Sequence, residues 1–273
     1  MRERSLIIRV LIGLVLVAAV LALVFWAPLW LFFLGLLPFG LLGLWEYLEL
    51  MGRVGVAPAR LPVYLVALAI WVAAAFRPVH WVPALLLGSL LLFAFSARTR
   101  SLTEIPATSA ASVFGLFYLA VPFALVFQVW AAPDGKWVLI YLLALVWIGD
   151  TAAYFGGRAL GRHKLAPVLS PGKTVEGTVI SALVTVGLGF WLFRAWFDPL
   201  GSSFWHGLLL PLVVNGAAQV GDLAESALKR AAGVKDSSAI IPGHGGVLDR
   251  IDALLFALPA LWYYWLLLLR GGF

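Results

Sequence analysis

The segment SPGKTVEG, residues 170–177, combines several residue types that bind phosphate within an otherwise apolar stretch of chain. The hydroxyl side chains of Ser170 and Thr174 flank a glycine and a lysine, Gly172 and Lys173. Glycine lets a backbone approach an anion closely, and lysine supplies a positive charge. We therefore predict that this segment holds phosphate groups of a substrate.

The segment is not a nucleotide-binding P-loop of the Walker type. That motif needs a glycine five residues before the Gly-Lys pair and a strand in front of the loop. Here the position is Pro167, and a membrane helix is expected to precede the segment. Glu176 has two interpretations, a substrate-binding residue or a cap at the start of the next helix.

A second polar segment, residues 225–252, contains the sequence SALKRAAGVKDSSAIIPGHGGVLDRID. The segment contains three aspartates. Their carboxylates suit Mg²⁺, which takes one or two protein carboxylates and completes its shell with water and phosphate oxygens. Basic residues beside them would bind phosphate oxygens. The glycine-rich turn covers residues 243–246, and the charged residues are Asp236, Asp249, Asp252, Lys229, Arg230, Lys235 and Arg250, with His244 beside them.

Polar residues also recur along the helix that leads into this segment. Asn215, Gln219, Asp222, Ser226 and Lys229 are spaced by four, three, four and three residues, which places them on one helix face. A carboxylate in hydrocarbon costs a few kcal/mol, so Asp222 should face a cavity, a cation or a partner charge. The alternative to a functional role is an intramembrane salt bridge, for example to an arginine of the first polar segment.

Three other acidic residues lie in or next to apolar helices. Asp150 precedes the first polar segment and is either a functional acid or a residue of helix packing. Glu46 and Glu49 lie at the end of the second apolar run and either line an entrance for lipid or serve as capping or snorkelling residues.

The composition predicts an all-α, polytopic integral membrane protein. The 273 residues are 63% hydrophobic and 12% charged, a balance outside the range of soluble domains. A bilayer core needs roughly 20 apolar residues per helix, and we expect about nine spans. Residues 1–135 are predicted to form N-terminal helices. Residues 136–273 are predicted to form a catalytic region with loops at 157–177 and 225–252. The spans lie near 6–26, 28–50, 61–76, 81–96, 108–131, 136–156, 178–197, 203–224 and 252–269.

The distribution of Lys and Arg predicts the orientation. Cytoplasmic loops carry an excess of these residues. With the N-terminus and both polar segments in the cytoplasm and the C-terminus outside, the predicted inner side holds 14 of the 19 basic residues. The net charge of +6 then describes a basic membrane face that suits anionic lipids or phosphorylated substrates, not nucleic acid. The general excess of Lys and Arg in cytoplasmic loops explains the isolated Arg53, Arg60, Arg98 and Arg100 equally well, without any contact to lipid or substrate. Cysteine is absent, which excludes disulfides and thiolate metal sites.

The second segment resembles the signature of phosphatidate cytidylyltransferases, also called CDP-diacylglycerol synthases. The matching residues are Ser226 to Arg230, Lys235-Asp236 and the run from Pro242 to Asp252, and Gly149-Asp150 through SPGKTVEG resembles a second region shared by that family. The resemblance implies an inner-membrane enzyme that joins CTP and phosphatidic acid to give CDP-diacylglycerol and pyrophosphate, with Mg²⁺ and as a homodimer.

Nucleotidyl transfer between two anions requires charge neutralisation and alignment. Two cations are expected, the second being Mg²⁺ or a monovalent ion, with Asp222 and Asp249 as ligands and Asp150, Asp236 and Asp252 as second choices. We expect Ser170, Lys173, Thr174 and Lys229 to hold the triphosphate, and Arg230, Lys235 and Arg250 to contact the triphosphate and the lipid phosphate. His244 is a phosphate donor or an anchor of the turn. Glu176, Ser226, Asp236, Gly245, Gly246 and Asp252 complete the predicted substrate-binding set.

Two other functions use some of the same features. A CTP-dependent kinase of a polyprenol-type lipid would also need Mg²⁺, a nucleotide and a lateral lipid entrance. A transporter would account for the intramembrane acids Asp150, Asp222 and Glu225. The gathering of these acids beside basic, glycine-rich loops at one membrane face favours surface chemistry over a transport pathway.

Overall fold

The computed structural model describes residues 17–197, 204–241 and 245–266 of the chain. Predicted site residue His244 and its neighbours Pro242 and Gly243 lie outside these ranges. Residues 6–16 of the first predicted span and 267–269 of the last also lie outside them. Within them the chain is built almost entirely of helices, as the composition predicts.

The helices follow one another along the chain with short connections. After a helical stretch at Val17–Trp26 come α2 (Leu29–Arg53), α3 (Arg60–Phe76), a 3₁₀ turn η1 (Pro78–His80), α4 (Trp81–Thr99), α5 (Ile105–Gly115), a π-helical turn η2 (Leu116–Ala120) and α6 (Val121–Ala131). The C-terminal half contains α7 (Gly135–Leu160), α8 (Val175–Phe197), α9 (Phe204–Ala231) and α10 (Leu248–Tyr264).

Among the described residues, six helical stretches are long and apolar enough to cross a membrane. They are 29–53, 78–99, 105–131, 135–160, 175–197 and 204–231, and two shorter apolar helices lie at 17–26 and 60–76. The fifth predicted span is one helical path in which α5, η2 and α6 join. Pro122 has no backbone N–H to donate one turn back, which accounts for the π-helical turn just before it. The chain is therefore a multi-pass membrane protein.

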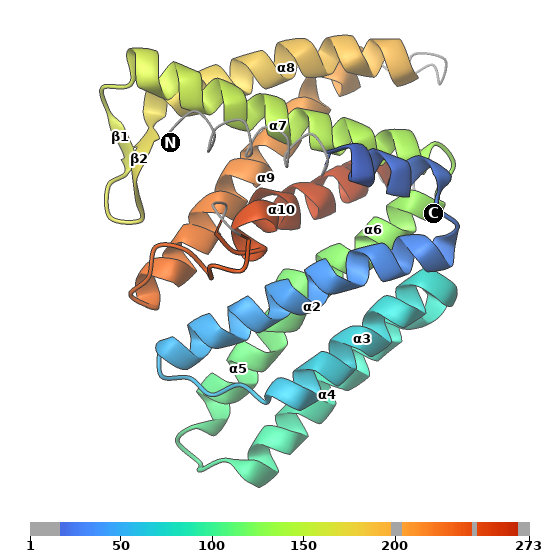
Figure 1. Cartoon of the computed structure of the whole chain (residues 1–273), viewed down its shortest axis with the longest axis vertical. Coiled ribbons are helices and arrows are strands. Elements are labelled where there is room, and N and C mark those ends of the chain that lie inside the picture. Colours follow the sequence, from blue (N-terminus) through green and yellow to red (C-terminus); the bar gives the residue numbers. More distant parts are fainter. Residues whose placement is uncertain (1–16, 198–203, 242–244, 267–273) are drawn as a thin grey trace, which may run out of the picture.

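Successive helices run in alternating directions, so alternate connections gather at one end of the bundle, at the left and lower left of Figure 1. These connections are 54–59, 100–104, 161–174 and 232–247. Both polar segments of the sequence therefore lie at the same end of the molecule, together with Arg53, Arg60, Arg98 and Arg100.

The first polar segment contains a β-hairpin that the sequence did not predict. Strands β1 (Lys164–Ala166) and β2 (Ser170–Thr174) pair antiparallel, with Lys164 opposite Thr174. The backbone N–H of Val175 donates to the carbonyl of His163 at 2.9 Å and continues the pairing to the start of α8. SPGKT is thus an extended strand, and the short strand β1 lies between it and the expected membrane helix, α7. Gly172 and Lys173 do not form a phosphate-wrapping loop in front of a helix.

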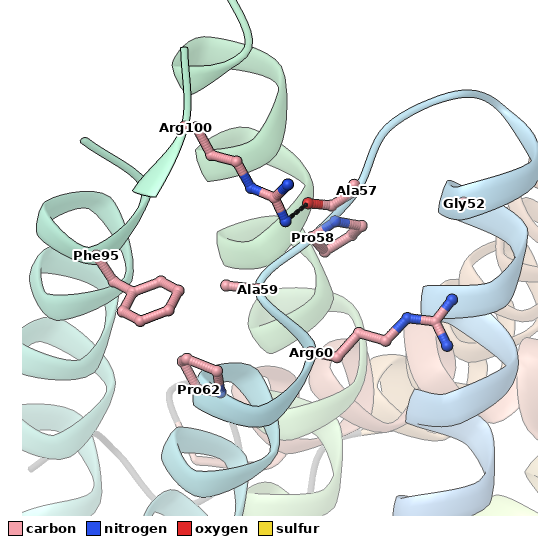
Figure 2. Close-up of a pocket in the computed structure, with 8 residues that line it drawn as sticks. All are labelled: Gly52, Ala57, Pro58, Ala59, Arg60, Pro62, Phe95 and Arg100. Carbon is pink, nitrogen blue, oxygen red and sulfur yellow. Dashed lines mark hydrogen bonds between the residues drawn. The ribbon is translucent and has the colours of Figure 1, made fainter. Parts of the chain in front are cut away.

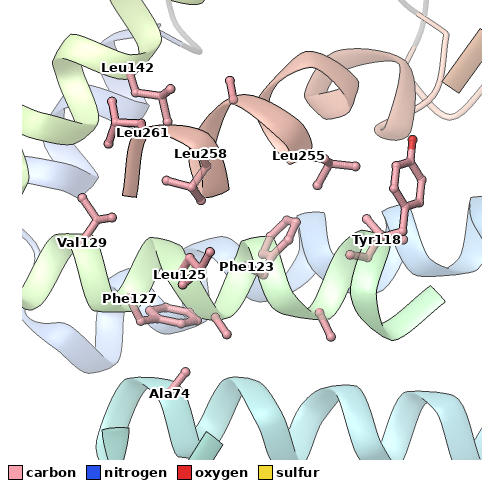
Figure 3. Packing of buried hydrophobic residues seen from close by; sticks show 14 of the residues in the cluster. Ala74, Tyr118, Phe123, Leu125, Phe127, Val129, Leu142, Leu255, Leu258 and Leu261 are labelled. Atoms are coloured by element: carbon pink, nitrogen blue, oxygen red, sulfur yellow. The ribbon is translucent and has the colours of Figure 1, made fainter. Parts of the chain in front are cut away.

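The predicted N-terminal and C-terminal regions share one buried apolar cluster. α10 packs against both α9 and α6, and α6 packs against α3 on its other side. Figure 3 shows this layer, with Leu255, Leu258 and Leu261 of α10 above Leu125 of α6 and Phe127 between α6 and α3. α10, which begins in the second polar segment, is therefore held by helices from both regions.

A polar network joins α7, α8 and α9 inside the bundle. The Nδ2 of buried Asn215 donates to the hydroxyls of Ser181 at 2.8 Å and Thr185 at 3.1 Å, and the Ser181 hydroxyl donates to the Gly149 carbonyl at 2.9 Å. A Cβ on Gly149 would lie 2.5 Å from Asn215 Nδ2, so glycine is required for this close approach. Asn215, the first member of the predicted polar stripe, is thus a packing residue.

We expect Asn215→Ala to lower the free energy of unfolding by about 1–2 kcal/mol, because hydrogen bonds between membrane helices contribute roughly 0.6–1.7 kcal/mol each. The measurement is an unfolding titration with sodium dodecyl sulfate in mixed micelles. Leu209→Ala, a truncation of a largely exposed residue on the same helix, is the control and should shift the midpoint less. Equal midpoints for the two variants would contradict a stabilising network.

Candidate active site

The second polar segment folds around the carboxylate of Glu46, which is completely buried at the end of α2. Its oxygens accept the backbone N–H groups of Val247 at 2.9 Å and Leu248 at 2.6 Å, where α10 begins. They also accept the hydroxyls of Ser237 at 3.0 Å and Ser238 at 2.6 Å. A negative charge at this helix start is favourable because the first N–H groups of a helix have no partner within it.

The carboxylate of Asp249 holds the same loop from the other side. Oδ2 accepts the backbone N–H of Ser237 at 3.0 Å, the Ser237 hydroxyl at 2.8 Å and the backbone N–H of Gly246 at 2.8 Å. Oδ1 accepts Nζ of Lys229 at 2.6 Å. Asp249, predicted as a metal ligand, therefore fixes the shape of the loop in this structure.

Two glycines of the predicted turn are required by this geometry. Gly245 has φ of +78°, which other residues rarely adopt. A Cβ on Gly246 would lie 2.0 Å from the Ser237 hydroxyl and 2.5 Å from a Glu46 oxygen. The turn glycines thus let the backbone enter the space between two carboxylates.

Three predicted acids come from three different helices and interact electrostatically with one another. Asp252 of α10 interacts electrostatically with Asp222 of α9 and with Asp150 of α7, and Asp150 also interacts with Asp222. Asp249 and Asp252 lie three residues apart at the start of α10 and so share a helix face. In the described ranges, no three His, Cys, Asp or Glu side chains are arranged closely enough to form a metal site by themselves.

The first polar segment reaches this acidic group through Lys173. Its Nζ lies 2.7 Å from Oδ2 of Asp222, so the SPGKT strand is paired with the polar stripe of α9. The salt bridge considered for Asp222 therefore exists, but its partner is a lysine and not an arginine. Neither side chain is fully buried, which leaves the pair open to rearrangement.

Lys229 forms the corresponding pair in the second segment. Its Nζ contacts Asp249 and the fully buried carboxylate of Glu225, one turn earlier on α9. The neighbouring Arg230 donates from Nε to the Leu169 carbonyl and from Nη1 to the Val234 carbonyl, both at 3.1 Å. Arg230 therefore ties the two polar segments together.

Glu176 and Thr174 have clear contacts within the chain. Glu176 accepts the backbone N–H groups of Arg162 at 3.0 Å and His163 at 3.2 Å, and the His163 ring at 2.6 Å. It therefore binds the segment that follows α7. The Thr174 hydroxyl accepts the backbone N–H of Gly177 at 3.1 Å and so caps α8, the role considered for Glu176.

The remaining predicted residues differ in exposure. Ser226 is buried, and Ser170 is half-buried at the start of β2. Lys235, Asp236 and Arg250 are exposed at the same end of the molecule. Their roles toward a substrate stay predictions.

For Glu46 the sequence left two interpretations, a lining of a lipid entrance and a capping or snorkelling residue. The complete burial of its side chain excludes the entrance, and its carboxylate accepts the first N–H groups of α10, a helix far along the chain that the sequence did not connect with it. Glu49, one turn later, instead forms an ion pair with Arg60 in which both side chains are partly exposed. The signal in the sequence was a carboxylate inside an apolar run, which requires partners wherever it is buried.

A cavity of about 390 Å³ lies at the same end of the bundle, away from the acids. Figure 2 shows Arg60 and Arg100 at its rim with Pro62 and Phe95, and Arg100 donates to the Ala57 carbonyl at 3.0 Å. A second cavity is lined by residues 159–163 and Glu176. Neither is lined by Asp150, Asp222 or Asp252, so we assign neither to the reacting groups.

We expect Glu46→Ala to lower the free energy of unfolding by about 3 kcal/mol, because two buried backbone N–H groups lose their acceptor at about 1–3 kcal/mol each. Glu49→Ala is the matched control on the same helix, and its exposed ion pair contributes less than about 1 kcal/mol. Thermal unfolding in detergent measures both variants, and limited proteolysis reports whether the loop at 232–247 opens. Equal destabilisation by the two substitutions would exclude Glu46 as the anchor of the loop.

Comparison with known proteins places this geometry in a family. The sequence model of the cytidylyltransferase family matches residues 7–268. The chain is 45% identical to a phosphatidate cytidylyltransferase of Haemophilus influenzae over 137 residues, which cover 50% of this chain and 48% of that protein. It is 43% identical to one of Staphylococcus haemolyticus over 132 residues, with 47% and 48% covered. A protein of the same name from Staphylococcus saprophyticus is 36% identical over 185 residues, with 66% and 70% covered.

The alignments with the first two of these proteins span about half of their length. The match to the family, in contrast, extends over nearly the whole chain and includes both polar segments and the helices that hold them. The chain therefore belongs to the cytidylyltransferase family.

Proposed function

We propose that the protein is a phosphatidate cytidylyltransferase. A phosphate oxygen of phosphatidic acid attacks the α-phosphorus of CTP, the bond from that phosphorus to the β-phosphate oxygen breaks, and pyrophosphate leaves. The products are CDP-diacylglycerol and pyrophosphate. The observation that carries this proposal is the family match over residues 7–268, and the names of the related proteins support it.

The site has the charges that such a reaction needs. Both reactants are anions, so the protein must neutralise charge while it aligns the attacking oxygen with the leaving group. Lys173, Lys229 and Arg230 come from two different segments and lie at one end of the bundle with the acids. We assign these cations to the triphosphate, and exposed Lys235 and Arg250 to the triphosphate and the lipid phosphate.

The acidic residues fit Mg²⁺ in their chemistry. Mg²⁺ is usually held by one or two protein carboxylates, with water and substrate phosphates as its other ligands, and Asp150, Asp222 and Asp252 are carboxylates that interact electrostatically with one another. We propose Asp222 and Asp249 as ligands, with Asp252 and Asp150 beside them. Bound there, the cation would neutralise negative charge on the phosphates that react. A second cation, divalent or monovalent, remains part of the proposal.

The two lysine–aspartate pairs suggest how the site accepts an anion. In the structure Lys173 pairs with Asp222, and Lys229 pairs with both Asp249 and Glu225. When a triphosphate binds, each ammonium group can move to phosphate oxygens, and the released carboxylates would then be able to hold a cation.

The first experiment is an assay of the purified protein in mixed micelles with CTP labelled at the α-phosphate, phosphatidic acid and Mg²⁺. We expect label in a lipid product and release of pyrophosphate only when phosphatidate is present. Asp249→Asn should remove this activity. Label that stays in CDP while a lipid alcohol gains phosphate would instead identify a lipid kinase. No label transfer to lipid under any condition would contradict the proposed function.

We expect Lys173→Gln to lower kcat/KM for CTP by about 10- to 100-fold, because a charge-assisted hydrogen bond contributes roughly 1.5–3 kcal/mol. The matched control is Lys164→Gln, since Lys164 is exposed and lies opposite Thr174 on the neighbouring strand. Steady-state rates at varied CTP measure both variants. A similar loss in the two variants would show that Lys173 acts only through the general charge of the hairpin.

We also propose that the end of the bundle with both polar segments faces the cytoplasm. The protein lacks cysteine, so single cysteines can report on it without background. Gly172, whose Cβ would meet nothing within 4 Å, marks this end, and Val79, which is 81% exposed, marks the other. In intact cells, a membrane-impermeant maleimide should label Val79→Cys and should reach Gly172→Cys only after permeabilisation. The opposite labelling pattern would reverse the orientation.

A further inference from the structure

The cavity with Arg60 and Arg100 at its rim is not used by the proposed reaction. Its volume of about 390 Å³ lies within the usual range for sites of small ligands. Its walls come from the end of α2, the connection 57–59, the first turn of α3 and the end of α4. Figure 2 shows the two arginines together with Pro62 and Phe95. The cavity therefore offers cationic and apolar contacts to one ligand.

Both arginines have donors left for a ligand. A guanidinium group carries five N–H donors. In the described part of the chain, Nη2 of Arg100 donates to the Ala57 carbonyl at 3.0 Å, and Nη1 of Arg60 pairs with Glu49. The side chains of that ion pair are 49% and 34% exposed, and such pairs are weak because water screens them. An anion in the cavity can therefore compete with Glu49 for Arg60.

The surroundings of the cavity carry an excess of positive charge. Arg53 and Arg98 lie in the last turns of α2 and α4, at the same end as the two cavity arginines. The acidic residues between positions 49 and 104 are Glu49 and Glu104 alone, and Glu104 accepts the backbone N–H and the hydroxyl of Ser101. Four arginines and two carboxylates leave a net positive charge, which attracts anionic lipid head groups at a membrane surface.

Exposed apolar side chains continue from the cavity along α3 and α4. Leu65 follows Pro62 by three residues, and Leu91 precedes Phe95 by four, so each shares a helix face with a residue that lines the cavity. Leu65 is 58% exposed and Leu91 is 66% exposed, and the two helices pack against each other. In a membrane these side chains contact acyl chains. A phospholipid can thus place its head group in the cavity and its chains on these helices.

We propose that this cavity binds the phosphate group of an anionic phospholipid, with Arg60 and Arg100 as donors and the acyl chains along α3 and α4. Arginine binds phosphate oxygens through two parallel N–H groups, which gives a bond to phosphate more strength than a bond to a neutral group. A lipid is favoured over a soluble phosphate because exposed apolar helix faces begin at the residues that line the cavity. The inference holds whether or not the protein makes CDP-diacylglycerol.

Native mass spectrometry of the detergent-solubilised protein with phosphatidylglycerol measures this binding. We expect one tightly bound lipid, and binding of zwitterionic phosphatidylcholine weaker by about 10-fold or more. Arg60→Gln combined with Arg100→Gln should raise Kd for phosphatidylglycerol about 30-fold. Arg53→Gln combined with Arg98→Gln is the matched control, because it removes the same charge from the same end without altering the cavity lining, and should change Kd less than about 3-fold. Equal weakening by both pairs would show attraction by the general charge alone and would overturn the proposal.

Glycerol 3-phosphate separates a lipid from a soluble phosphate as the ligand. It has the charged group without acyl chains, so we expect its Kd to be higher than that of phosphatidylglycerol by about 100-fold or more. Isothermal titration in the same detergent measures it. Similar affinities for the two compounds would assign the cavity to a soluble phosphate and would refute a lipid site.

Glu49→Gln should change the binding in the opposite direction. The substitution removes the carboxylate that competes for Arg60, so we expect Kd for phosphatidylglycerol to fall about 3-fold. Partial unfolding cannot produce tighter binding, so this variant tests the cavity independently of how well the arginine variants fold. Unchanged or weaker binding in Glu49→Gln would contradict a role for Arg60 as a lipid donor.

Discussion

The buried carboxylate of Glu46 is the contact on which the site depends. It comes from α2, early in the chain, and it accepts the first backbone N–H groups of α10 and two serine hydroxyls of the loop before that helix. Asp249 satisfies the opposite side of the same loop. Because a carboxylate buried without donors would be strongly unfavourable, this loop can adopt its shape only when α2 and α10 are packed together.

This dependence explains why the N-terminal helices belong to the functional unit. The sequence of residues 1–135 shows little beyond apolar spans, and its polar residues give no recognisable motif. In the structure, α6 packs against α10, α2 anchors the loop, and Tyr118 of η2 packs edge-on against Phe256 of α10. Residues of the N-terminal half of the chain thus hold polar parts of the C-terminal half in place.

Much of the fold and the position of the site could be predicted from composition and spacing. Hydrophobic runs of sufficient length give membrane helices, and the 4-3-4-3 spacing placed Asp222 and Lys229 on one face of α9. There Asp222 pairs with Lys173 of the first polar segment and Lys229 pairs with Asp249 of α10. The predictions failed where the outcome depends on long-range partners. From the sequence alone, Glu46 is interpreted as a residue near the membrane surface. Its role depends on four hydrogen-bond donors from residues 237–248, which the sequence does not connect with it. The β-hairpin at 164–174 was missed because strands of three and five residues carry too little periodicity to distinguish from a polar loop.

The same geometry separates residues that hold the site from residues that can act on a substrate. The hydrogen bonds of Glu46, Glu176 and Thr174 go to backbone N–H groups that would otherwise lack an acceptor, so moving these side chains costs the free energy of several bonds. Lys173 and Lys229 instead pair with carboxylates, and a phosphate can replace a carboxylate as the partner of an ammonium group at little cost. A family signature that contains both kinds of residue therefore includes residues that only hold the site together. In the proposed function, the exchangeable charge pairs are the part of it that binds the triphosphate and the lipid phosphate.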